Sequence, residues 1–147
     1  MPNIALLRCQ HDALEEYAAD LLGETERFAD HGDGYAISIK LSRFLSHLRA
    51  HLRQEDRYLY PRMMAHEQPA VAQTARRFFD EMGRLAADME RFAETYRTSR
   101  EIQADYPGFR QSLYRLIGLL AERIKRENNE LFPLAARTVD RGRNQAA

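Results

Sequence analysis

Three short clusters of glycine, proline and polar turn residues divide the chain into four long segments. These clusters lie at residues 31–34, 66–69 and 99–108. Between them, apolar residues recur at the spacing of a helix rather than in the alternation of a strand. Four amphipathic helices joined by short loops favour an all-α fold, an antiparallel four-helix bundle of up-down-up-down topology.

The boundaries of the expected helices follow from the same breaks. The first two helices are predicted over about residues 4–30 and 35–65, and the next two begin near Pro69 and Pro107, since proline suits the first turn of a helix. A chain of 147 residues is long enough to bury one core. We therefore expect one domain over residues 1–140 and a flexible C-terminal tail over residues 141–147.

The charge balance and the apolar runs exclude several classes of protein. Lys plus Arg and Asp plus Glu both number 22, so the formal net charge is zero, which argues against a broad nucleic-acid surface. The apolar runs are too short for a membrane span or a signal peptide. Cys9 is a lone cysteine, so no intramolecular disulfide forms. We expect a cytoplasmic protein with no nucleic-acid or membrane partner, and no pattern specifies its oligomeric state.

The second and fourth segments contain an internal repeat. Residues 43–61 align without a gap to residues 115–133, and both stretches end in Glu-x-x-x-Leu-aromatic-Pro. This motif begins at Glu55 in the first copy and at Glu127 in the second. Because proline interrupts helical hydrogen bonding, each copy is expected to kink or break at the same relative place.

Five ionisable side chains fall on the apolar stripes of three predicted helices. Residues four apart share a helix face, so each carboxylate of the repeat has a partner one turn earlier. Buried charges are costly unless they are paired or bind a cation, and a metal held by imidazoles and carboxylates would meet that need. The alternative is that these residues lie nearer the rim of the bundle, and a lone histidine on an apolar stripe, such as His11, is more often simply packed or hydrogen-bonded. The five residues are His11, His51, Glu55, Arg123 and Glu127.

These motifs resemble the hemerythrin/HHE cation-binding family over nearly the whole chain. The resemblance is carried by an early histidine on the first helix, by His-x-x-x-Glu before Leu-aromatic-Pro on the second, and by the same carboxylate motif on the fourth. It implies two irons that are bridged by two carboxylates and capped by histidines. The matching residues are His11, His51, Glu55 followed by Asp56, and Glu127.

Two of the ligands that the resemblance implies are missing. Arg123 stands where the fourth helix should offer a histidine, and Met82 stands at the inward position of the third. In the family, the first two helices supply the histidines of one iron and the last two helices those of the other. The chain thus retains one half of the site, for which the expected ligands are His11, His51, Glu55 and Glu127.

Three hypotheses follow. The first is a mononuclear site that holds one iron rather than two, or zinc or manganese, and senses a small diatomic ligand or redox state. The second is a metal-free bundle in which Arg123 neutralises Glu127, Glu55 or both, and which binds a protein partner in regulation. The third is an intact two-metal centre with a misplaced ligand, for which His47 is the best spare.

An enzyme with a nucleophile and a base is the least supported class. Cys9 lies two residues before His11, and residues two apart on a helix do not face each other. The sequence contains no glycine-rich phosphate loop, no Cys-x-x-Cys and no Gly-x-Ser-x-Gly element. We therefore expect a binding protein rather than an enzyme.

Overall fold

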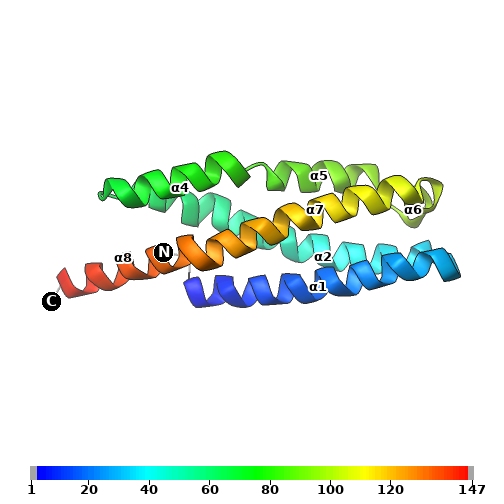
Figure 1. Ribbon diagram of the computed structural model, residues 1–147, viewed down its shortest axis with the longest axis horizontal. Helices are drawn as coiled ribbons and strands as arrows, with labels where there is room; N and C mark the ends of the chain where they lie inside the picture. The colour runs from blue at the N-terminus through cyan, green and yellow to red at the C-terminus, as the bar shows by residue number, and fades with distance from the viewer. Residues whose placement is uncertain (1–2, 146–147) are drawn as a thin grey trace.

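The computed structural model describes residues 3–145, with side chains over residues 3–30 and 32–138. Every regular element in this part of the chain is helical, as predicted, and it contains no strand (Figure 1). In chain order, these elements are α1 (Ile4–His31), α2 (Gly34–Gln54), the π-helical turn η1 (Glu55–Leu59), α3 (Tyr60–Met64), α4 (Pro69–Met82), α5 (Leu85–Thr95), α6 (Ser99–Ala104), α7 (Tyr106–Arg126), the π-helical turn η2 (Glu127–Leu131) and α8 (Phe132–Gln145).

The long helices lie lengthwise beside one another (Figure 1). α1 packs along α2, and α5 packs along α7. The predicted starts at Pro69 and Pro107 are confirmed, because each proline lies in the first turn of its helix. Among the described helices, none is long and apolar enough to cross a membrane.

The turn between α1 and α2 shows how the sequence sets the helix ends. Gly32 follows α1 with a φ of 63°, a left-handed conformation that a residue with a side chain rarely adopts. The Asp33 side chain then accepts hydrogen bonds from the backbone N–H groups of Tyr35 and Ala36. Two adjacent residues thus end one helix and begin the next.

The third predicted helix is not continuous, which corrects the sequence-based expectation. It divides into α4 and α5 at Gly83 and Arg84. The Gly83 N–H donates to the carbonyl of Phe79 at 2.7 Å, and a Cβ atom at Gly83 would lie 2.4 Å from that same oxygen. The sharp turn therefore depends on glycine, and it leaves the carbonyl of Met82 among the last of its helix, which have no partner within it.

The break predicted at residues 99–108 contains the short helix α6. Thr98 begins this helix with a capping box: its side chain accepts from the Arg100 N–H, and the Glu101 carboxylate accepts from the Thr98 N–H. The four-residue pattern Thr-x-x-Glu is a recognisable start signal for a helix, so α6 was readable from the sequence.

The prolines of the repeat do not break their helices. The run from α2 through η1 to α3 is continuous, and so is the run from α7 through η2 to α8. In each run a π-helical turn comes just before the proline, and its last N–H reaches five residues back, from Tyr60 to Glu55 and from Phe132 to Glu127. The wider turn accommodates a residue that has no N–H to donate, so the predicted interruption takes the form of a π bulge.

The apolar core consists of two clusters, one toward each end of the bundle. The larger cluster is built by α1, α2, α5, α6 and α7, and the smaller one by the start of α1, α3, α4, α8 and the two π-helical turns. A layer of buried polar side chains lies between them. Along α1, for example, Leu7 belongs to the smaller cluster and Leu14 to the larger, and the buried His11 lies between them.

The predicted tail over residues 141–147 overlaps the end of α8, whose backbone is helical to Gln145. Residues 146 and 147 lie outside the described part of the chain. The domain boundary at residue 140 and the flexibility of the tail stay predictions.

Candidate metal centre

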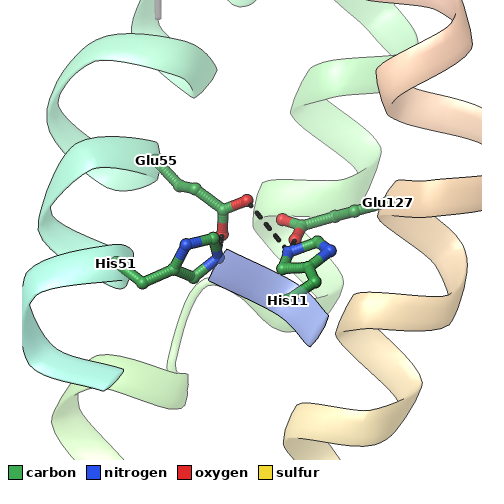
Figure 2. Close-up of side chains that lie close together, drawn as sticks. All are labelled: His11, His51, Glu55 and Glu127. Carbon is green, nitrogen blue, oxygen red and sulfur yellow. Dashed lines mark ion pairs between the residues drawn. The ribbon is translucent and has the colours of Figure 1, made fainter. Parts of the chain in front are cut away.

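Four of the five inward-facing residues form a compact group of possible metal ligands in the polar layer. Each offers one nitrogen or oxygen atom, and these atoms all lie within 4.8 Å of one another. Figure 2 shows the four side chains converging, with His51 and Glu55 on one continuous helical run and His11 and Glu127 on two others. The group consists of His11 on α1, His51 on α2, Glu55 at the start of η1 and Glu127 at the start of η2.

The distances between these side chains are those of direct contact. His11 Nε2 lies 3.1 Å from Glu127 Oε1 and 3.6 Å from Glu55 Oε2. His51 Nε2 lies 3.2 Å from Glu55 Oε1, one helical turn along. All four residues are at most 2% exposed. The structure therefore brings together the residues predicted from the repeat and from the first helix.

Four buried nitrogen and oxygen atoms in this group, each able to bind a metal ion, have no well-formed hydrogen bond. They are one atom from each residue: His11 Nε2, His51 Nε2, Glu55 Oε2 and Glu127 Oε1. Buried polar atoms are nearly always paired, so four unpaired atoms that face one point indicate a missing common partner. Two imidazole nitrogens and two carboxylate oxygens are a donor set that suits iron, zinc or manganese. The residues thus fit a metal ion.

Each histidine is held at its other ring nitrogen by a side-chain amide. Asn128 Oδ1 lies 2.8 Å from His11 Nδ1, and Gln10 Oε1 lies 2.6 Å from His51 Nδ1. Sequence reasoning missed both amides. Their positions could have indicated them, because Gln10 directly precedes His11 and Asn128 directly follows Glu127.

Arg123 lies beside the four residues and pairs with both carboxylates, as one hypothesis predicted. Its Nε lies 3.1 Å from Glu127 Oε2, and its Nη2 lies 3.2 Å from Glu55 Oε1. Nη2 also lies 2.7 Å from Asp56 Oδ1, and Nη1 donates to the backbone carbonyl of Met82 at 3.2 Å. The guanidinium is almost fully buried and uses all its nitrogens in these contacts.

Tyr60 completes the arginine side of the centre and was also missed. Its hydroxyl donates to Glu127 Oε2 at 2.6 Å, and its ring centroid lies 5.2 Å from the Arg123 guanidinium carbon. The equivalent residue in the second copy of the repeat, Phe132, stacks on the His11 ring at 5.0 Å. Both aromatic residues of the repeat therefore contact the centre.

Two other predicted residues lie elsewhere or act differently. The Met82 side chain is half-buried and packs against the smaller apolar cluster, so Met82 takes part through its backbone carbonyl rather than through its sulfur. His47 is exposed and stacks on Tyr17 at a centroid distance of 4.5 Å. It is outside the group of four, so the suggestion of His47 as a spare ligand is not supported.

The pKa values of the two buried glutamates are shifted in opposite directions. Burial raises the pKa of Glu55, but the adjacent His11 and His51 imidazoles and the charge of Arg123 outweigh it and hold that pKa well below the usual range. Burial, together with the charge of Glu55, raises the pKa of Glu127. Burial lowers the pKa of His11, yet the adjacent carboxylates of Glu127 and Glu55 raise it to about 9. Without a metal, a proton on His11 partly compensates the carboxylates.

The fixed charges of the centre leave an excess of two negative charges. Burial opposes the charge of Arg123, but the carboxylates around it raise its pKa, so it stays cationic. Three carboxylates, those of Glu55, Asp56 and Glu127, contact this one cation and would carry three negative charges when all are deprotonated. With neutral imidazoles, one divalent ion would bring the centre to neutrality.

A buried centre of imidazoles and carboxylates on facing helices is typical of helical proteins that bind metal through carboxylates. Within this class, residues 3–135 match the hemerythrin HHE cation-binding domain. The chain belongs to this family, as the sequence motifs indicated. Searches of curated proteins and of solved structures gave no match.

Proposed function

We propose that this protein binds one divalent metal ion through His11, His51, Glu55 and Glu127, with iron as the first candidate and zinc or manganese as alternatives. The observation that carries the proposal is the convergence of four buried donor atoms that lack hydrogen-bond partners. The excess of two negative charges supports a single divalent ion as their partner.

The position of Arg123 supports one ion rather than two. Its guanidinium already contacts both glutamates, and a permanent positive charge there disfavours a second cation nearby. We infer that Arg123 takes the place of the second metal in an up-down-up-down four-helix bundle of the family type. The arginine also orients Glu55 and Glu127 toward the histidines.

A role in sensing a small molecule or redox state fits this centre better than catalysis. When bound, a metal with four protein ligands supplies redox chemistry, if it is iron, and a position for a small diatomic ligand. The residues themselves exclude water and large substrates, since each is at most 2% exposed. We also propose a cytoplasmic location, which the exposed free thiol of Cys9 supports.

A metal-free role is the second candidate. Its specific support is that Arg123 pairs with Glu55, Asp56 and Glu127. In this form, the protonated His11 supplies the remaining positive charge, and the function is regulatory binding of another protein. This alternative depends on ion pairs from His11 to Glu127 and Glu55, and the atoms that face one another in these pairs form no well-aligned hydrogen bond.

Elemental analysis and calorimetric titration separate the two candidates. We expect purified protein, stripped with chelator and titrated with Zn(II) or with anaerobic Fe(II), to bind one equivalent. His11→Ala and His51→Ala should each abolish this binding. His47→Ala is the matched control, since it removes an exposed histidine one turn before His51 on the same helix. A stripped parent protein that ignores both ions would favour the metal-free candidate.

A further inference from the structure

The two amides that hold the histidines form a connected set beside the centre. Asn128 Oδ1 contacts His11 Nδ1 at 2.8 Å, and Gln10 Oε1 contacts His51 Nδ1 at 2.6 Å. Gln10 is itself held, because its Nε2 donates to Gln54 Oε1 at 3.1 Å. Both amides are at least half-buried, and each lies next to a ligand in the sequence.

The direction of these hydrogen bonds decides what the histidines can bind. When an amide oxygen faces Nδ1, the proton lies on Nδ1 and the lone pair lies on Nε2, which points into the centre. The opposite orientation, with the amide N–H toward Nδ1, would place the proton on Nε2. His11 would then donate to Glu127 and could not bind a metal. The contact from Gln10 Nε2 to Gln54 favours the first orientation for Gln10.

The neutrality of these partners also sets the charge of the centre. A carboxylate at Nδ1 would add a negative charge and make the imidazole more basic, whereas an amide adds no charge. Asp56 occupies the place of Asn128 in the other copy of the repeat, where it faces Arg123. The chain therefore has a carboxylate beside its arginine and an amide beside its histidine at equivalent positions.

We propose that Gln10 and Asn128 are positioning residues that hold both imidazoles with the proton on Nδ1 and with Nε2 facing the centre, and that the absence of charge on the two amides makes the centre prefer divalent over trivalent ions. This inference rests on the proposed metal binding. Its two parts are testable separately, since the hydrogen bonds exist without a metal and the preference requires one.

The first experiment uses metal-free, ¹⁵N-labelled protein and NMR of the histidine side chains. We expect a slowly exchanging Nδ1–H proton for both His11 and His51, whether the rings are neutral or protonated. Asn128→Leu should remove this signal for His11 alone, and Gln10→Leu for His51 alone. Asn129→Leu is the matched control, since Asn129 is exposed and adjacent to Asn128. Protons found only on Nε2 in the parent would overturn the positioning role even if metal binding is confirmed.

The second experiment measures affinity for Zn(II) and for Ga(III), a trivalent ion without redox chemistry. Loss of a partner that orients a histidine should weaken Zn(II) binding about 10–100-fold in Asn128→Leu and Gln10→Leu. Asn128→Asp keeps the acceptor, so it should retain Zn(II) binding and shift the Ga(III)-to-Zn(II) ratio by on the order of tenfold or more. Asn129→Asp adds the same charge at the surface and should leave the ratio unchanged.

These outcomes distinguish the two levels of the proposal. A parent protein that binds neither ion refutes the proposed function, whatever the NMR shows. A parent that binds Zn(II) as tightly as Asn128→Leu and Gln10→Leu do refutes the positioning role. An unchanged ion ratio in Asn128→Asp refutes the preference. If the leucine variants do not fold, as judged by circular dichroism, Asn128→Ala and Gln10→Ala serve the same purpose with less steric change.

Discussion

The two copies of the repeat have the same backbone conformation but differ in the side chain one turn before the buried glutamate. The run α2–η1–α3 and the run α7–η2–α8 both have a buried glutamate at the start of a π-helical turn. The backbone carbonyl of that glutamate accepts a hydrogen bond from the N–H five residues later. One turn before that glutamate, the first copy has His51 and the second has Arg123. At this position the first copy offers an imidazole that could bind a metal, and the second copy offers a fixed positive charge.

Residues at equivalent positions of the two copies contact opposite sides of the centre. Asp56 and Tyr60, from the first copy, contact Arg123 and Glu127. Their equivalents in the second copy, Asn128 and Phe132, contact His11. The surrounding residues have therefore diverged with the cation: an acid and a hydroxyl face the arginine, and an amide and an apolar ring face the histidine.

The largest expected effect comes from removing the built-in cation. Arg123→Leu leaves Glu55 and Glu127 buried without their partner, and breaking a buried ion pair costs about 3–5 kcal/mol. We expect a loss of that size in the free energy of unfolding, measured with urea. Arg115→Leu, on the exposed side of the same helix, should change it by less than about 0.5 kcal/mol. Parent-like stability in Arg123→Leu would show that the arginine half needs no cation.

The second prediction makes the two halves alike. The double variant Met82→His with Arg123→His returns an imidazole to both positions where the family ligands are missing. The backbone carbonyl of Met82 lies against Arg123, so a histidine at position 82 would need only to turn its side chain from the apolar cluster toward the vacated guanidinium position, and the metal content should then rise from one to two ions per chain. Elemental analysis measures this, and Arg123→His alone is the control. A double variant that still binds one ion would mean that the halves differ by more than these side chains.

The third prediction replaces Tyr60 by phenylalanine, the residue type found at the equivalent position, Phe132. Tyr60→Phe removes the hydroxyl that donates to Glu127, and a hydrogen bond to a charged group contributes about 1.5–3 kcal/mol. The Arg123 Nε still donates to that oxygen, so we expect a loss of stability near 1.5 kcal/mol in urea unfolding. Tyr58→Phe, which alters an exposed tyrosine nearby, should have no effect. A Tyr60 variant that is indistinguishable from Tyr58→Phe would contradict this role.

The smallest expected effect comes from Asp56→Asn, which gives the first copy the amide of the second. Asp56 is the closest acceptor of Arg123, but its side chain is 21% exposed and partly screened by solvent. We expect a loss of stability of about 1 kcal/mol or less, measured by thermal or urea unfolding. Asp12→Asn, at an exposed position of α1, is the control. A loss larger than that of Tyr60→Phe would reverse the order proposed here.

The residues that the sequence predicted correctly lie on straight helix faces. His51 with Glu55, and Arg123 with Glu127, are four apart within or at the end of an α-helix, so a simple periodicity places them inward. The gapless repeat then predicted that the two glutamates are equivalent. His11 followed from its place on the apolar stripe of the first helix.

The residues that the sequence did not predict lie where that periodicity changes. A π-helical turn contains more residues than an α-helical turn, so Tyr60, which follows the whole of η1, reaches the centre from a position that a regular helix would turn away. Asn128 lies beside the inward face, directly after Glu127, and contacts His11 from there. The break at Gly83 likewise ends α4 at Met82, whose backbone carbonyl then accepts from Arg123. Gln10 was missed because a polar residue beside an apolar stripe has no periodic signal of its own.

The division of the core into two apolar clusters has a consequence for how the protein opens. With a polar layer between them, the clusters need not unfold as one cooperative unit. The smaller cluster, formed by the start of α1 with α3, α4 and α8, should exchange its amide protons sooner than the larger one. A bound ion would link the two clusters across the polar layer. Metal occupancy would then slow amide-proton exchange throughout the end of the molecule that contains the smaller cluster.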